Sequence, residues 1–210
     1  KARLARPLRW RHHQAMGNAG PASSSPRSFS INRAPVLTLW AAVVAERLGY
    51  HPDEAATFGK SVAGLNAASK ARALGLAKPR ERTRPATKTA RGRGRTVDVE
   101  LLGRTFPAHE TSNGLRALHD GKPISPESVA RYLEGKFGEH LAAARQALTA
   151  LARSRPPGQL AAEAFALYEA FRPEIPPGTR GWGAKGVFDP GQVARLAGGA
   201  DRRGSGPAGS

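Results

Sequence analysis

Residues 36–45 are the stretch that most constrains what this chain can fold into. They carry no charge, and Thr38 is their only polar side chain. Pro35 stands where the first turn of a helix tolerates a missing N–H, and Gly49 stands where a helix commonly stops. A helix that is apolar on every face has to be covered on every face, and this one is far too short to span a bilayer. We therefore expect it at the centre of a hydrophobic core.

A second helix is predicted directly after it, from residue 52 to about residue 74. Every fourth residue of this segment is small, and residues at that spacing share one helix face. The members of this small-residue face are Ala55, Gly59, Ala63, Ala67 and Ala71. We predict a tight helical hairpin over residues 34–76. Its small-residue face is covered either by the first helix or by a second copy of the chain, which would make the protein a homo-oligomer.

The net charge of +17 is concentrated outside the segments that we expect to fold. Residues 1–30 hold six Lys or Arg and no acid, and residues 77–96 hold eight Lys or Arg and one acid. Residues 97–200, in contrast, hold twelve basic and eleven acidic side chains. Attraction to DNA, RNA or another polyanion would therefore begin in the two basic segments.

Residues 1–30 are predicted to be a disordered basic tail, and three interpretations of them stay open. They are a nucleic-acid-binding arm, an organelle transit peptide, or a product of the gene model, since Met16 is the only methionine. Residues 198–210 are a second predicted disordered tail.

Residues 77–95 are predicted to be an exposed basic linker, because their Pro, Gly and alternating Arg residues cannot build a core. Arg-Gly repeats are common in disordered segments that contact nucleic acids, whereas a plain soluble spacer has a similar composition. The candidate nucleic-acid-binding residues here are Arg80, Arg82, Arg84, Arg91, Arg93 and Arg95.

Residues 96–197 are expected to fold as a β-hairpin followed by a helical bundle. Val97, Val99 and Leu101 alternate with acids, which indicates a strand, and we expect a β-hairpin over residues 96–108 whose return strand begins with Thr105 and Phe106, before Pro107. We predict helices over residues 113–119, 125–137, 138–155, 159–171 and 190–196, with a Gly/Pro loop over 176–186. The predicted fold class is mostly α, as a helical hairpin plus a small helical bundle with one β-hairpin.

The segment 124–133 is similar to the recognition helix of helix-turn-helix DNA-binding proteins. Ser125 would cap this helix, and Ser125, Ser128 and Arg131 would face phosphates or base edges. A short helix that includes residues 115–118 would be the supporting helix. The alternative is an ordinary capped helix in a bundle, which the long connection over 119–123 favours.

The glycine-rich segment 181–186 has the spacing G-x-G-x-x-G, but a Pro-rich loop precedes it and no βαβ unit surrounds it. We therefore reject a dinucleotide site. Two interpretations remain. In one, Arg180 and Lys185 hold a phosphate and Trp182 stacks on a base. In the other, Trp182 closes one end of the core while the glycines allow the turns.

No segment carries a recognisable catalytic or metal-binding pattern. The six histidines show no metal-ligand spacing, the Gly-x-Ser-x-Gly motif is absent, and the chain has no cysteine. We expect no cofactor and no metal, and the balance is against an enzyme. The lack of cysteine and of a long apolar segment predicts a cytoplasmic protein without a membrane span.

Three segments, 31–40 (INRAPVLTLW), 171–174 (FRPE) and 181–186 (GWGAKG), resemble an uncharacterised family of small bacterial proteins. The resemblance covers roughly residues 31–197 and implies no activity. The leading hypothesis from the sequence is a non-catalytic nucleic-acid-binding protein of low sequence selectivity. The alternative is a protein-interaction or assembly module built on helix packing.

Overall fold

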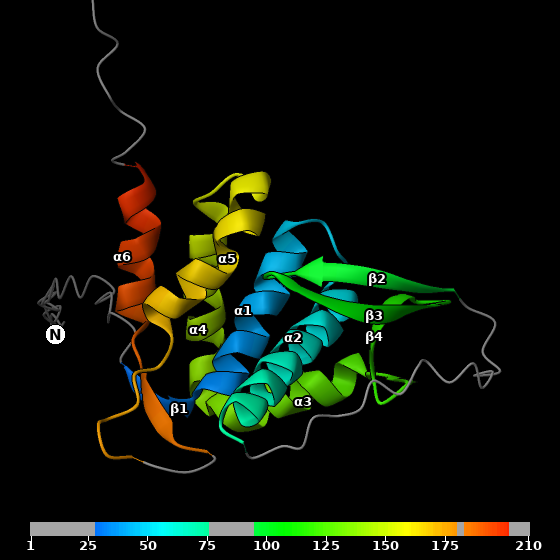
Figure 1. The fold of residues 1–210 in the computed structure, drawn as a ribbon. Helices are drawn as coiled ribbons and strands as arrows, with labels where there is room; N and C mark the ends of the chain where they lie inside the picture. The colour runs from blue at the N-terminus through cyan, green and yellow to red at the C-terminus, as the bar shows by residue number, and fades with distance from the viewer. Residues whose placement is uncertain (1–27, 76–94, 180–182, 202–210) are drawn as a thin grey trace, which may run out of the picture.

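The computed structural model describes residues 28–75, 95–179 and 183–201, and shows helices packed with two antiparallel sheets (Figure 1). In chain order the elements are β1 (Phe29–Asn32), α1 (Arg33–Arg47), α2 (Pro52–Ala73), β2 (Thr96–Leu101), β3 (Arg104–Thr111), β4 (Gly114–His119), β5 (Lys122–Pro123), α3 (Pro126–Phe137), the 3₁₀ turn η1 (Gly138–His140), α4 (Leu141–Arg153), α5 (Pro157–Phe171), β6 (Lys185–Phe188) and α6 (Pro190–Asp201). Among these described residues, no helix is both long and apolar enough to cross a membrane.

Helix α1 is the centre of the core, as its sequence predicts. Every residue of this helix from Pro35 to Ala45 is buried. Figure 1 shows α1 between α2 on one side and α4 and α5 on the other. The predicted helical hairpin of α1 and α2 is therefore present, and residues of α3, α4 and α5 belong to the same hydrophobic cluster.

The small-residue face of α2 is packed against α1 within the chain. A Cβ atom at Gly59 would collide with the carbonyl oxygen of Thr38 and lie 3.0 Å from the backbone N of Ala42. Ala55 and Ala63 are buried beside this contact. Ala55, Gly59 and Ala63 are thus covered by the protein's own first helix, and a second copy is not needed to bury them.

Helix α5 closes the opposite side of α1 with two polar anchors. The buried indole N–H of Trp40 donates to the carbonyl oxygen of Ala164 at 2.8 Å, and the hydroxyl of Tyr168 donates to that of Arg33 at 3.3 Å. The Trp40 ring also packs edge-on against Phe171, with centroids 5.3 Å apart. These bonds let large rings with polar tips enter the core without an unpaired donor.

The prediction of a mostly α fold with one β-hairpin is wrong, because the chain is a mixed α/β protein. The region predicted as a helix over 113–119 is the strand β4, which completes a four-stranded sheet of order β2-β3-β4-β5. β4 and β5 are joined by Asp120 and Gly121, both at positive φ, which is the two-residue turn that suits a hairpin. The second sheet, β1 with β6, was also not predicted.

The return strand of the first hairpin is longer than predicted, because β3 extends to Thr111, beyond the predicted end of the hairpin at Ala108. β3 runs through Pro107, which pairs with Asp98 of β2. The pairing of β3 with β4 begins only at Ala108, opposite Ala117. Pro107 is thus tolerated because β3 has a single strand neighbour at that position.

Four predicted helices agree with the structure, with small changes at their ends. Ser125 caps α3, the turn η1 separates α3 from α4, and α5 ends at Phe171. Asp189 accepts the N–H of Gly191 at 2.8 Å at the start of α6, and this helix continues to Asp201, beyond the predicted end at residue 196. The predicted loop over 176–186 is shortened by β6, which begins at Lys185.

The close approach of α1 and α2 predicts an asymmetry between two glycines of α2. Gly59→Ala should destabilise the fold by about 1–3 kcal/mol, because the new methyl group overpacks the contact with Thr38. Gly64→Ala should be neutral or stabilise by up to about 1 kcal/mol, because its Cβ meets no atom within 4 Å and alanine favours helix. Urea unfolding of both variants measures this difference. Equal stability of the two variants would contradict the packing described here.

Burial raises the pKa of Tyr168 to about 12, although the nearby Arg33 lowers it. The folded state holds this proton more tightly than the unfolded chain, in which tyrosine titrates near pH 10. Stability should therefore fall as the pH rises from about 10 towards about 12, and Tyr168→Phe should remove that part of the loss. Denaturant unfolding between about pH 9 and 11 compares the two proteins. The same pH dependence in both would show that Tyr168 is not the group responsible.

Candidate functional site

A cavity of about 600 Å³ lies between the second half of α2, the β4–β5 hairpin and the start of α3. Its volume falls in the range of small-molecule sites. The apolar part of its wall includes Leu65, Leu118 and Ile124, and the basic side chains at it are Lys60 and Lys122. Two segments that are far apart in the sequence, 60–68 and 118–128, therefore meet at one hollow.

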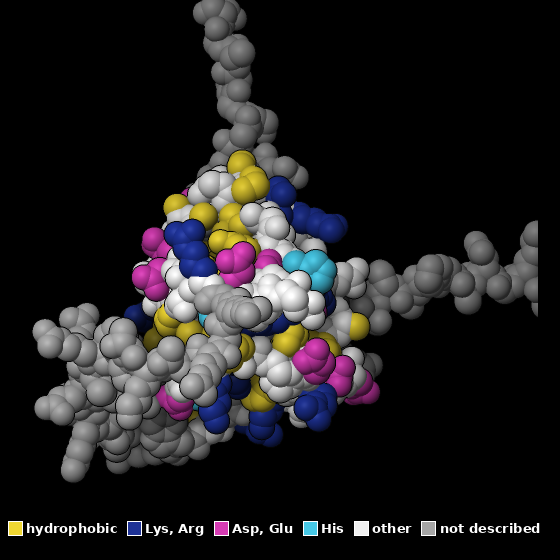
Figure 2. All heavy atoms as spheres, turned by 90° about the vertical axis from the view of Figure 1, so that its right-hand side faces the viewer, with side chains coloured by type: hydrophobic (Ala, Val, Ile, Leu, Met, Phe, Trp, Pro, Cys, Tyr) yellow, Lys and Arg dark blue, Asp and Glu magenta, His cyan; other side chains and the backbone are white. Residues whose placement is uncertain are grey.

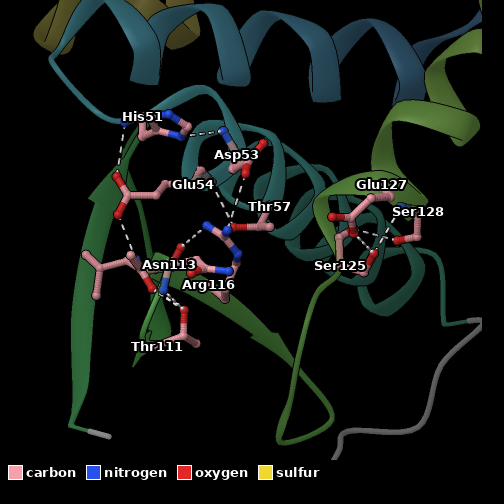
Figure 3. Close-up of polar contacts among 12 residues, drawn as sticks. His51, Asp53, Glu54, Thr57, Thr111, Asn113, Arg116, Ser125, Glu127 and Ser128 are labelled. Atoms are coloured by element: carbon pink, nitrogen blue, oxygen red, sulfur yellow. Dashed lines mark hydrogen bonds and ion pairs between the residues drawn. The ribbon is translucent and has the colours of Figure 1, made fainter.

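Side chains of α2 hold β4 in place by bonding to its backbone (Figure 3). The Glu54 carboxylate accepts the N–H of Leu115 at 2.6 Å and the N–H of His51 at 3.0 Å. The Thr57 hydroxyl accepts the buried N–H of Ala117 at 3.1 Å. β5 is only two residues long, so α2 replaces a strand neighbour along this edge of the sheet.

Arg116 of β4 is a structural residue, although its side chain is cationic. It is 7% exposed, its guanidinium lies 3.5 Å from the Asp53 carboxylate, and it also donates to the carbonyl oxygen of Leu115 at 3.1 Å. Figure 3 shows it between α2 and the sheet. Arg116 is thus occupied in docking the sheet and is not presented to a phosphate.

Ser125 and Ser128 form the N-terminal cap of α3. The Ser125 hydroxyl accepts the N–H of Ser128 at 3.2 Å and donates to the Glu127 carboxylate. The Ser128 hydroxyl donates to the carbonyl oxygen of Ser125 at 2.7 Å. The bond from Ser125 is the largest cause of the lowered pKa of Glu127, with backbone bonding and the nearby Arg116 and Arg131 acting in the same direction. Both hydroxyls are therefore used within the cap.

The helix-turn-helix interpretation is not compatible with this structure. Its supporting helix would include residues 115–118, which lie in the strand β4. Arg131 is exposed on α3, and Ser125 and Ser128 belong to the cap at its start. Of these three residues, only Arg131 has a side chain that is exposed to solvent and not used in the helix cap, as a contact with phosphate would require.

The other predicted nucleic-acid contacts are not gathered at this site. Arg80, Arg82, Arg84, Arg91 and Arg93 lie outside the described residues, as do Arg180 and Trp182. Arg95 is exposed, and its backbone carbonyl accepts the N–H of Glu110 at 2.9 Å. Lys185 is exposed in β6, in register with Asn32 of β1, and does not line the cavity.

Lys60 of α2 is a cation that the structure places at the cavity wall. It is half-buried there, with its ammonium 3.7 Å from the centroid of the Tyr132 ring. Burial and the neighbouring Lys136 lower the pKa of Lys60. The sequence signal that could have found the site was the pair of turn motifs, Asn113-Gly114 and Asp120-Gly121, which place a hairpin opposite α2.

Catalytic machinery was not expected from the sequence, and the described residues contain no group of three His, Asp or Glu side chains that could hold a metal ion. His119 and Asp120 face each other at 3.6 Å on the β4–β5 hairpin, where both are largely exposed. Exposed pairs of this kind contribute little to stability.

Comparison with known proteins identifies no relative: no protein-family model, no curated protein and no solved structure matches the chain. The resemblance of segments 31–40, 171–174 and 181–186 to a family of small bacterial proteins therefore stays a prediction. The functional case depends on the chain's own charges and geometry.

The bond between Thr57 and β4 should contribute measurably to stability. Thr57→Val keeps the shape of the side chain but leaves the buried N–H of Ala117 without an acceptor, which costs about 1–3 kcal/mol. Thr57→Ser keeps the hydroxyl and is the matched control, with a smaller loss expected. Urea unfolding gives the two free energies. No loss in Thr57→Val, or a loss smaller than that of Thr57→Ser, would contradict the contribution of this bond.

Proposed function

We propose that this chain is a non-catalytic nucleic-acid-binding protein of low sequence selectivity, in which the basic segments make the principal contacts. The observation that carries the proposal is the separation of charge from fold. The described residues hold 17 Lys or Arg and 15 Asp or Glu, a net charge of +2. The remaining residues hold 16 Lys or Arg and one acid, a net charge of +15.

This distribution supports electrostatic binding to a phosphate backbone. Lys and Arg that neutralise phosphates release condensed counterions, which is the main source of affinity that does not depend on sequence. On the face seen in Figure 2, the visible basic side chains are interspersed with acidic ones and form no continuous basic patch. The folded part would then act mainly as a scaffold that carries the segments 1–27 and 76–94.

The structure changes which folded residues enter the proposal. Ser125 and Ser128 are withdrawn as direct contacts because both hydroxyls serve the α3 cap. Arg131 and Lys185 remain as exposed cations that can add phosphate contacts. A cytoplasmic location, favoured by the absence of cysteine, is part of the same proposal.

The alternative of an assembly module gains no support from the packing of α2. The face on which it depended is packed on α1 at Ala55, Gly59 and Ala63, and only Ala67 of its central part is half-buried. A homo-oligomer would need a different surface, and no observation on the described residues singles one out.

Binding of a duplex DNA and of a single-stranded RNA, each measured at several salt concentrations, tests the proposal. We expect affinity to fall steeply with salt, with a slope of about −0.9 for each phosphate neutralised on duplex DNA. A variant with Gln at Arg80, Arg82, Arg84, Arg91, Arg93 and Arg95 should bind more weakly, and its slope should be shallower by up to about 5. This variant preserves the length of the linker and therefore does not strain the fold.

The matched control removes six exposed basic side chains from the folded part. These are Arg47, Lys70, Arg72, Lys122, Lys136 and Arg153, again replaced by Gln. The control has the same change in net charge, so a smaller loss of affinity and slope would localise the contacts in the linker. An unchanged slope for the linker variant, or no binding by the natural sequence at low salt, would refute the proposal.

A further inference from the structure

The cavity beside α2 holds a cation, Lys60, to which no described residue supplies a counter-charge. The ammonium of Lys60 is half-buried, and no carboxylate of the described residues forms an ion pair with it. The neighbouring Lys136, which is of the same sign, acts on it unfavourably. Among the described residues, the carboxylate at the cavity wall belongs to Asp120, which faces the imidazole of His119. An ammonium in this position is less well solvated than in water and repelled by its neighbour, and an anion would relieve both effects.

Lys60 is also held in place by an aromatic neighbour. Its ammonium lies over the face of the Tyr132 ring at 3.7 Å, a cation–π contact that limits the motion of a long side chain and offsets part of its lost hydration. Of the serine hydroxyls at the same wall, those of Ser125 and Ser128 are occupied by the α3 cap. Lys60 is therefore the polar group best placed to determine which ligand the cavity accepts.

The apolar part of the cavity wall determines what the uncharged part of the ligand can be. Most of the lining surface is apolar, contributed by side chains such as Leu65, Leu118 and Ile124. A dianion such as a phosphate monoester would need more than one half-buried cation and would be repelled by Asp120. A molecule with a single negative charge and an apolar body matches both parts of the wall.

We propose that this cavity binds a small organic carboxylate, with its aromatic or aliphatic body against Leu65, Leu118 and Ile124 and its carboxylate on the ammonium of Lys60. The cavity of about 600 Å³ has room for such a molecule. The site is distinct from the basic segments and does not depend on nucleic-acid binding.

A series of probes with one shape and different charge tests the proposal. The probes are 2-naphthoate, its neutral amide 2-naphthamide, and the cationic 2-naphthylmethylamine, titrated into the full isotope-labelled chain at about 0.15 M salt. Amide shifts observed by NMR should map to Gly64, Ile124 and Ser128 for 2-naphthoate. The amide should bind at least about tenfold more weakly, because it loses a charge-assisted hydrogen bond, and the amine should bind most weakly.

Two pairs of variants locate the site. Lys60→Met keeps the apolar stem and should lower the affinity for 2-naphthoate about tenfold, to that of the amide, while Lys70→Met on the same helix should change nothing. Gly64→Leu places a branched side chain at the cavity wall, narrows the cavity and should weaken binding strongly. Gly135→Leu on α3 is its control, since a Cβ at either glycine meets no atom within 4 Å. All four substitutions leave the core untouched, so thermal unfolding should show folded proteins.

Several outcomes would overturn the proposal. Equal affinity for 2-naphthoate and 2-naphthamide would show that Lys60 does not select an anion. Unchanged binding in Lys60→Met or Gly64→Leu, or shifts that map away from α2 and β4, would place the ligand elsewhere. Absence of shifts at millimolar 2-naphthoate would show that the cavity does not take this class of ligand.

Discussion

The structure depends on the complete burial of α1. Ten consecutive residues without a charge leave this helix no face that can meet water, so each neighbouring element has to present a surface that fits it. α2 does so by approaching until Gly59 touches the backbone of Thr38. α5 does so by offering the carbonyl oxygen of Ala164 to the indole of Trp40. The burial of α1 thus requires a small residue of α2 at one contact and a carbonyl oxygen of α5 that can accept a hydrogen bond at the other.

The sheet is attached to the rest of the fold through α2, the helix that packs against α1. Its β4 edge meets α2, and is held there by the polar side chains of Glu54 and Thr57. This contact is tight near the start of α2 and opens into the cavity about one turn further along, from Lys60 onward. Lys60 is half-buried because it lies where α2 passes from a packed seam to a hollow. The cavity is therefore a result of the way the sheet is docked.

The sequence was sufficient to predict elements that local rules determine and insufficient for those that distant contacts determine. α1, α2, α3 and α5 follow from apolar periodicity, capping residues and prolines. The short apolar run 115–118 fits a helix or a strand equally well, and the turn pairs Asn113-Gly114 and Asp120-Gly121 should have decided for a strand. β1 and β6 are four residues each and lie more than 150 residues apart, so neither indicates the other. The sequence around Lys60 does not distinguish it from an exposed lysine, because its burial depends on the β4–β5 hairpin, which is distant in the sequence.

The two proposed activities use electrostatics in different regimes, which makes them separable in one protein. Charges in exposed segments are screened over about 8 Å at physiological salt, so affinity that depends on them falls steeply as salt rises. A carboxylate on half-buried Lys60 sits against an apolar wall, where salt screens a charge pair much less. The separation of a nearly neutral fold from strongly basic segments therefore allows the same chain to hold a small anion at salt concentrations that release a nucleic acid.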